Sequence, residues 1–301
     1  DAGLGRGDGA GRHHAVEDDG GTAGGAAAVT YAAHPEGGYE YTFHDPKAAL
    51  YRARESVAAL VGAAPTEVVF TSCGSESDNH AIRGLVDAYP EKGHVITTKV
   101  EHPAVKNQVP YLRRKGLQVT ELGVNARGNL DLEELRDAIT AETLLISVIF
   151  ANNETGVISP LEEICRIAKE RGVFVHTDAV QAVGKVPLDM QKLPVDLLSF
   201  SGHKFHAPKG IGVLYIRKGT KFSPYMIGGH QEHGRRGGTE NVAAIVGLGK
   251  ASELARDHIL KDMARVQRLR DKLESELLNR VPNAFVNGDR QNRLPNTTSI
   301  A

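Results

Sequence analysis

The sequence has no tryptophan, only two cysteines, and no apolar run near the roughly 18 residues that a membrane-spanning helix requires. Cys73 and Cys165 are too few for a disulfide framework, which favours a reducing cytoplasm over an oxidising compartment. The 36 basic and 37 acidic residues leave a formal net charge of -1, without the positive excess that nucleic-acid binding requires. The start lacks a basic segment followed by an apolar core, which argues against a secretory signal. We therefore expect a cytoplasmic protein that binds neither nucleic acid nor a membrane.

Residues 1–30 are rich in glycine and show almost no apolar periodicity. Such a segment cannot bury enough surface to offset the entropy that it would lose on ordering. We therefore expect a mobile arm. The pair His13-His14 lies in this arm without a further ligand at metal-binding spacing, so we do not interpret it as a metal site.

From Asp45 onward, stretches with the helical period alternate with short apolar stretches typical of buried strands. Strands are predicted at 67–71, 94–98, 117–122, 144–150, 173–177, 195–198 and 210–216, and helices at 46–62, 75–89, 103–115, 131–139, 160–171, 241–256 and 258–280. This alternation predicts an α/β fold with a mainly parallel sheet between layers of helices. Residues 31–245 are expected to form this large domain. Residues 246–301 are expected to begin a smaller C-terminal domain that is incomplete in this chain, with new strands near 284–286 and 298–301.

Polar residues follow several of the predicted strands, at the edge where an open parallel sheet binds its ligands. Gly74 and Ser75 open a helix after strand 67–71, where backbone N–H groups suit a phosphate, although a plain helix cap is the simpler interpretation. His102 follows strand 94–98, either as a surface turn residue or as a lid over a flat cofactor. Asn152 and Asn153 follow strand 144–150, where paired asparagines often only form a turn.

Two charged residues complete this series. Asp178 ends strand 173–177 in an apolar stretch, where a carboxylate needs a partner such as a protonated pyridine nitrogen. Lys204 follows strand 195–198, with Ser201 and His203 beside it. It is either a core-edge residue whose amine reaches water or an amine placed to condense with a carbonyl, as in pyridoxal phosphate enzymes. Because five strands end in groups that suit one cofactor, we interpret Lys204 as a site residue.

Six segments resemble the cysteine desulfurases of the nitrogen-fixation and iron–sulfur-cluster type, which belong to the class V aminotransferase group of fold-type I pyridoxal phosphate enzymes. They lie at 70–79, 101–103, 152–157, 176–185, 199–204 and 228–241, in the family's order and with matching spacing. The resemblance covers about residues 45–301 and implies the fold-type I large domain. The implied reaction removes sulfur from L-cysteine, leaves L-alanine and forms a persulfide on an enzyme cysteine. The sulfur would then pass to an iron–sulfur scaffold or another acceptor protein.

The resemblance also implies how matching residues would bind pyridoxal 5'-phosphate. Lys204 would bind the cofactor covalently and later act as a general base. Asp178 would pair with the pyridine nitrogen, and His102 would stack on the ring and shuttle protons. Gln181 would hydrogen-bond the phenolate oxygen, and Asn153 would lie by that oxygen and the substrate carboxylate.

The phosphate would be held by four residues: Gly74, Ser75, Ser201 and His203. Thr239 would reach the phosphate in the other subunit's site, which implies a homodimer with shared active sites. His230 and His233 are interpreted as part of the loop over that site, and no metal ligand is predicted.

The chain departs from the family's pattern at both ends. The sulfur-accepting cysteine and the substrate-carboxylate arginine are expected beyond residue 299, and neither Cys73 nor Cys165 matches the cysteine's position. Residues 1–30 show nothing like the family's opening strand and turn. Three hypotheses stay open: a cysteine desulfurase that is inactive as given, a related lyase or aminotransferase such as a selenocysteine lyase, or a non-catalytic relic or partner-binding subunit.

Overall fold

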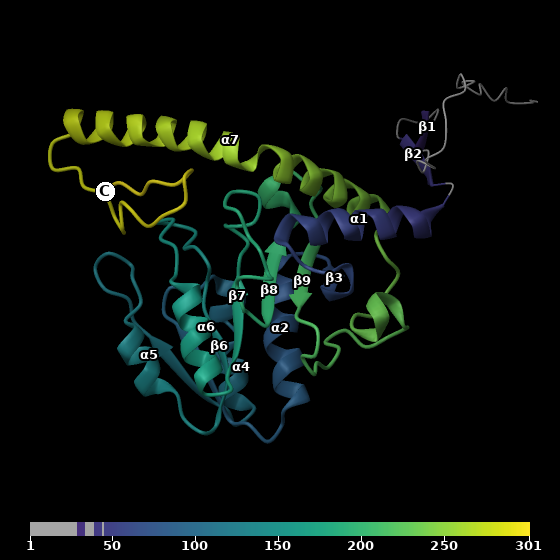
Figure 1. Cartoon of the computed structure of the whole chain (residues 1–301), viewed down its shortest axis with the longest axis horizontal. Helices are drawn as coiled ribbons and strands as arrows, with labels where there is room; N and C mark the ends of the chain where they lie inside the picture. The colour runs from purple at the N-terminus through teal and green to yellow at the C-terminus, as the bar shows by residue number, and fades with distance from the viewer. Residues whose placement is uncertain (1–28, 34–38, 44) are drawn as a thin grey trace, which may run out of the picture. The chain divides into compact units, whose positions relative to one another are not determined.

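The computed structural model describes residues 29–33, 39–43 and 45–301, and the chain divides into two compact units, Asp1–His44 and Asp45–Ala301 (Figure 1). In the first unit, β1 (Val29–Ala33) and β2 (Tyr39–Phe43) pair as antiparallel strands. The predicted arm lies outside the described residues except for its last two positions. In the described residues, no helix combines the length and apolar content needed to cross a membrane.

The second unit contains a seven-stranded sheet in the order β3-β9-β8-β7-β6-β4-β5. Its strands are β3 (Val68–Thr71), β4 (His94–Thr98), β5 (Gln118–Leu122), β6 (Thr143–Ser147), β7 (Phe174–Asp178), β8 (Leu197–Ser201) and β9 (Gly212–Ile216). Strand β9 runs antiparallel to both of its neighbours, β3 and β8, and the other pairs are parallel. The predicted α/β class with a mainly parallel sheet is confirmed. This arrangement brings the carboxyl ends of β3, β4, β6, β7 and β8 to one edge of the sheet.

Helices cover both faces of this sheet. They are α1 (Pro46–Val61), α2 (Gly74–Ala88), α3 (Pro103–Lys106), α4 (Val109–Arg114), α5 (Leu132–Ala138), α6 (Leu161–Glu170) and α7 (Val242–Arg280). One apolar cluster joins α2, α3 and α4 to the sheet, and a larger one joins α1, α5, α6 and the start of α7 to the opposite face. Successive side chains of a strand point to opposite faces of the sheet. In β8, Leu197 accordingly belongs to the first cluster, and Leu198 and Phe200 belong to the second.

Three predicted elements differ in the structure. The helix expected at 103–115 is broken into α3 and α4, because Pro110 lacks the N–H that an unbroken helix would need at that position. The two helices expected at 241–256 and 258–280 form one helix, α7, since neither glycine nor proline interrupts residues 256–258. The strands expected near 284–286 and 298–301 reduce to a single bridge between Val286 and Ile300. The proposed boundary at residue 245 falls inside α7 and stays a prediction.

Helices α1 and α7 lie side by side, and a glycine allows their close approach (Figure 1). A Cβ atom on Gly249 would lie 2.7 Å from Cα and 2.8 Å from Cβ of Ala53. We expect Gly249→Ala to lower the free energy of unfolding, because overpacking against a backbone costs about 1–3 kcal/mol. We expect this packing cost to exceed the roughly 1 kcal/mol by which alanine stabilises a helix interior relative to glycine. Gly93→Ala is the control in a denaturant titration, because a Cβ there meets nothing within 4 Å; equal losses in both variants would contradict the packing argument.

Candidate active site

The carboxyl ends of β3, β4, β6, β7 and β8 surround a cavity of about 240 Å³. Nine of the ten predicted site residues line it: Gly74, Ser75, His102, Asn153, Asp178, Gln181, Ser201, His203 and Lys204. Cys73, Asp78, Ile149 and Val180 complete the lining. These residues are spread over 132 positions of the sequence (73 to 204), and the parallel topology gathers them at one edge.

Asp178 is the last residue of β7, and its side chain is buried at the base of this cavity. The carboxylate Oδ1 accepts a hydrogen bond from the Val180 backbone N–H at 2.9 Å. Burial raises the pKa of Asp178, and the Val180 N–H and the positive charge of Lys204 lower it in part. A buried carboxyl in this setting favours a cationic hydrogen-bond donor as its ligand.

Lys204 lies in a short 3-10 helix, η2 (Gly202–Phe205), that directly follows β8. Gly202 allows η2 to pack closely, because a Cβ there would lie 3.0 Å from each of Ala207, Ile211 and Leu248. Phe205 is buried in the core and anchors the turn, while Lys204 is exposed to the cavity. The ordered turn therefore presents an amine beside the Asp178 carboxyl.

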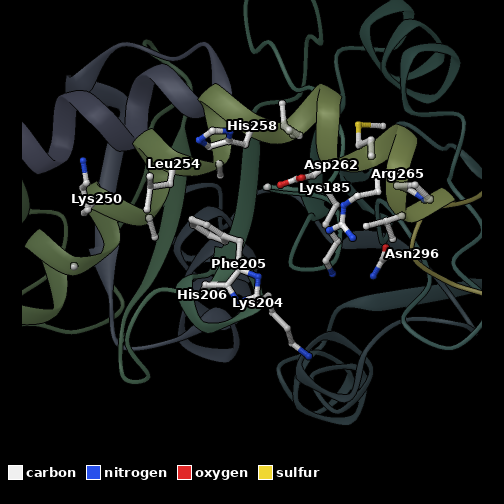
Figure 2. A pocket seen from close by; sticks show the side chains of 18 of the residues that line it. Lys185, Lys204, Phe205, His206, Lys250, Leu254, His258, Asp262, Arg265 and Asn296 are labelled. Atoms are coloured by element: carbon white, nitrogen blue, oxygen red, sulfur yellow. The ribbon is translucent and has the colours of Figure 1, made fainter. Parts of the chain in front are cut away.

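A second cavity, of about 760 Å³, lies beneath α7 and shares Lys204 with the first (Figure 2). Figure 2 shows Lys185, Arg265 and Asn296 on one side of it, with Lys204 at its lower edge. Burial and the charge of Lys204 lower the pKa of Lys185 to about 8. Lys204 thus contributes to the lining of both cavities.

The start of α2 provides a cradle for an anion. Its first residues, Gly74 and Ser75, line the cavity together with Ser201 and His203, and Ser201 Oγ lies 2.9 Å from His203 Nδ1. A Cβ on Gly74 would lie 2.8 Å from Val180 Cγ2, so glycine allows the start of α2 to pack this closely against Val180. The N–H groups and the positive dipole end of a 15-residue helix, together with two hydroxyls, suit a phosphate.

Two further predicted residues have their orientation fixed by hydrogen bonds. His102 Nδ1 accepts from the Ala104 backbone N–H at 3.1 Å, so the proton of the neutral ring lies on Nε2. Gln181 Oε1 accepts from Lys185 Nζ at 2.8 Å, so its amide N–H₂ is the end that can donate to a ligand oxygen. Asn153 lines the cavity from the turn after β6.

Thr239 does not line this cavity. It lies at a smaller one of about 150 Å³, near Ser72, Gly210 and Arg236. Two ion pairs hold this segment against the core: Glu232 with Arg54 at 2.7 Å, and Arg236 with Glu76 at 2.9 Å. The role of Thr239 in a partner subunit's site stays a prediction.

Sequence reasoning missed two buried acids: Asp78, which lines the cavity, and Glu101, which precedes His102 in the sequence but does not line the cavity. Asp78 follows Gly74 by four positions and Ser75 by three, a spacing that places it on their face of α2 and that could have revealed it. Ligand atoms of Asp78, His102 and Asp178 all lie within 4.8 Å of one another, but a cluster of this kind does not by itself identify a metal site.

Glu101 should make the stability of the protein depend on pH. Its Oε1 accepts from Thr98 Oγ1 at 2.7 Å and from the Ile149 N–H at 2.9 Å, and burial raises its pKa to about 8. Below a pH of roughly 4.3, the pKa of a glutamate in the unfolded chain, Glu101 is protonated in both states and the protein has its full stability. As the pH rises towards 8, the unfolded chain ionises while the folded protein does not, so the free energy of unfolding falls. Relative to Glu101→Gln, the wild type should therefore lose on the order of a few kcal/mol between pH 5 and pH 8. Urea titrations of both proteins measure this, and a pH-independent difference would contradict the assignment.

The fold and the site define the class of the protein. Residues 30–301 match the family described as Aminotransferase class-V, and the chain belongs to that family. Within it, the chain is similar to the cysteine desulfurase of Nostoc sp. strain PCC 7120, at 57% identity over 252 residues, and to the cysteine desulfurase NifS of Azotobacter vinelandii, at 53% over 254 residues. Both matches cover 84% of this chain, which spans 63% of the length of either relative.

Solved structures agree with these relatives. A NifS-like protein superimposes with a TM-score of 0.82 at 42% identity, covering 85% of this chain and 70% of that one. A structure described as SspA in complex with cysteine gives a TM-score of 0.67 at 43% identity, covering 69% of this chain and 61% of that one. The resemblance to cysteine desulfurases inferred from the motifs is thus confirmed.

Proposed function

We propose that the cavity binds pyridoxal 5'-phosphate and that the whole protein is a cysteine desulfurase. The observation that carries the proposal is the convergence of Lys204, Asp178 and His102, from three separate strand ends, on one cavity beside the start of α2. The residues present fit the cofactor: an amine for its aldehyde, a buried carboxyl for its ring nitrogen, and a helix start with two serine hydroxyls for its phosphate. The similarity to named cysteine desulfurases supports the same assignment.

When bound, pyridoxal phosphate supplies an electron sink for negative charge that develops at the substrate's α-carbon. The Asp178 carboxylate keeps the ring nitrogen protonated. The amine of Lys204, which lines both cavities, removes the proton from the α-carbon. The His102 Nε2–H donates towards the reacting atoms, and the Gln181 amide N–H₂ donates to the ring oxygen.

Transfer of sulfur needs a thiolate nucleophile, and we propose that neither cysteine of this chain supplies it. Burial raises the pKa of the Cys165 thiol to about 12, which keeps it protonated and unreactive. Cys73 lies at the start of α2, where it forms part of the phosphate cradle. The whole protein would form a homodimer in which Thr239 completes the partner's site, and it would pass sulfur to an acceptor or iron–sulfur scaffold protein.

The test is a titration of the cofactor-loaded chain with L-cysteine. We expect a saturable change in visible absorption, no comparable change with D-cysteine, and little release of alanine even with excess dithiothreitol. The Cys73→Ser variant should show the same change in absorption. A visible spectrum that does not change on addition of L-cysteine would overturn the proposed substrate. Rapid release of alanine that is lost in Cys73→Ser would overturn the proposal that neither cysteine of this chain is the nucleophile.

A further inference from the structure

Asp78 is a buried carboxyl with no role in the mechanism above. It lies on the first turns of α2, is 1% exposed, and lines the small cavity opposite Asp178. Its Oδ1 has no hydrogen-bond partner among the described residues. The carboxylate oxygens of Asp78 and Asp178 lie within 4.8 Å of each other. Two buried carboxyls therefore line the same small cavity.

The groups packed against Asp78 offer it no full positive charge. From β7, His176 Nε2 lies 3.6 Å from Asp78 Oδ1, but burial lowers the pKa of His176 to about 3, so the ring is neutral. This ring is held between Ser147 Oγ, at 2.8 Å from Nδ1, and Ser199 Oγ, at 2.9 Å from Nε2. From β8, the Ser199 hydroxyl opposes the effect of burial and lowers the pKa of Asp78 in part.

His102 also lies within 4.8 Å of Asp78, and its Nδ1 accepts from the Ala104 N–H, as a neutral ring does. Three further titratable neighbours, Asp178 on β7, Glu101 after β4 and Cys73 at the start of α2, disfavour a negative charge on Asp78. Burial and the charge of Asp178 raise the pKa of Asp78 well above its ordinary value. Asp178 differs, because the hydrogen bond from the Val180 N–H and the charge of Lys204 favour its ionised form. Two carboxyls this close cannot both ionise in a buried site, so the acid without a cationic neighbour keeps the proton.

We propose that Asp78 is a positioning residue that stays a neutral carboxylic acid, so that Asp178 alone carries the negative charge facing the cofactor's ring nitrogen. This proposal deepens the proposed function and rests on it for the identity of the cofactor. The protonation state of Asp78 belongs to the protein itself, so it can be measured without any cofactor.

The first experiment is infrared difference spectroscopy of the cofactor-free protein at pH 7. The carbonyl stretch of a protonated carboxylic acid should be present in the wild type and lost in Asp78→Asn, while Asp178→Asn should retain it. Glu101 contributes a second such band, so the comparison is made in the Glu101→Gln background. If Asp78→Asn does not fold, the band is titrated in Glu101→Gln alone: persistence to pH 8 supports the proposal, and loss below pH 6 overturns it. Loss of a carboxylate band in Asp78→Asn, in place of the acid band, also overturns it.

The second experiment measures the affinity for pyridoxal phosphate by fluorescence titration. Asp78→Ala should weaken binding about tenfold, as expected for the loss of a buried hydrogen-bonding group. Asp78→Asn, which keeps a neutral hydrogen-bonding group of the same shape, should recover most of that loss. Equal weakening by Asn and Ala would show that the charge of Asp78 matters and would overturn the proposal. If the wild type binds no cofactor, the proposed function fails, while the infrared result still decides the state of Asp78.

Discussion

Lys204→Ala is expected to leave a folded protein that no longer holds pyridoxal phosphate covalently. The side chain is exposed to the cavity, whereas its neighbour Phe205 anchors the turn in the core, so truncation removes the amine without disturbing η2. The visible absorption of the loaded wild type should be absent from the variant after gel filtration. In the whole protein, loss of this general base should slow turnover by at least roughly 10²–10⁴-fold.

Lys209→Ala is the matched control for this variant. It removes an exposed lysine five positions further along the chain that lines neither of the two cavities. Its absorption should equal that of the wild type. A Lys204→Ala protein that keeps the visible band after filtration would show that another group holds the cofactor.

Asp178→Asn is expected to weaken the binding of pyridoxal phosphate by about 10²–10³-fold. Asp178 is buried, and loss of one partner from a buried charged pair costs about 3–5 kcal/mol. Each 1.4 kcal/mol corresponds to tenfold in affinity. Asparagine keeps the shape and can still accept from the Val180 N–H, so the fold should survive. Equilibrium titration measures the affinity, with the exposed Asp137→Asn on α5 as the control; a loss smaller than tenfold would contradict the proposed pairing with the ring nitrogen.

Most of the fold could be predicted from the sequence, because central strands such as β6 and β9 are short and largely apolar and the helices are amphipathic. Local pattern could not place β9 between β3 and β8, since strand order depends on contacts between distant segments. It also missed the continuity of α7, because charged residues at 256–258 look like a boundary yet break no hydrogen bond of the helix. The break before Pro110 was visible in principle, as proline is unfavourable inside a helix.

Residues of the candidate site could be predicted from the sequence only where they lie at the end of a predicted strand. Asp178 and Lys204 each come directly after an apolar strand, so their convergence could be expected from a parallel sheet. Asp78 comes from the interior of a helix, so its place at the cavity depends on how α2 packs against the sheet, and only its spacing from Gly74 and Ser75 indicates it. Thr239 lies apart from the cavity, and its place depends on a second subunit that one chain does not contain.

Two lysines that could hold the cofactor, Lys204 and Lys185, line the same larger cavity. Lys185 shares the larger cavity with Lys204 and has its pKa lowered to about 8, which makes it a competing nucleophile (Figure 2). Reduction of the loaded protein with borohydride, followed by proteolysis and mass spectrometry of the peptides, identifies the labelled residue directly. We predict one label per chain, on Lys204. A label on Lys185, or none on either lysine, would contradict this prediction.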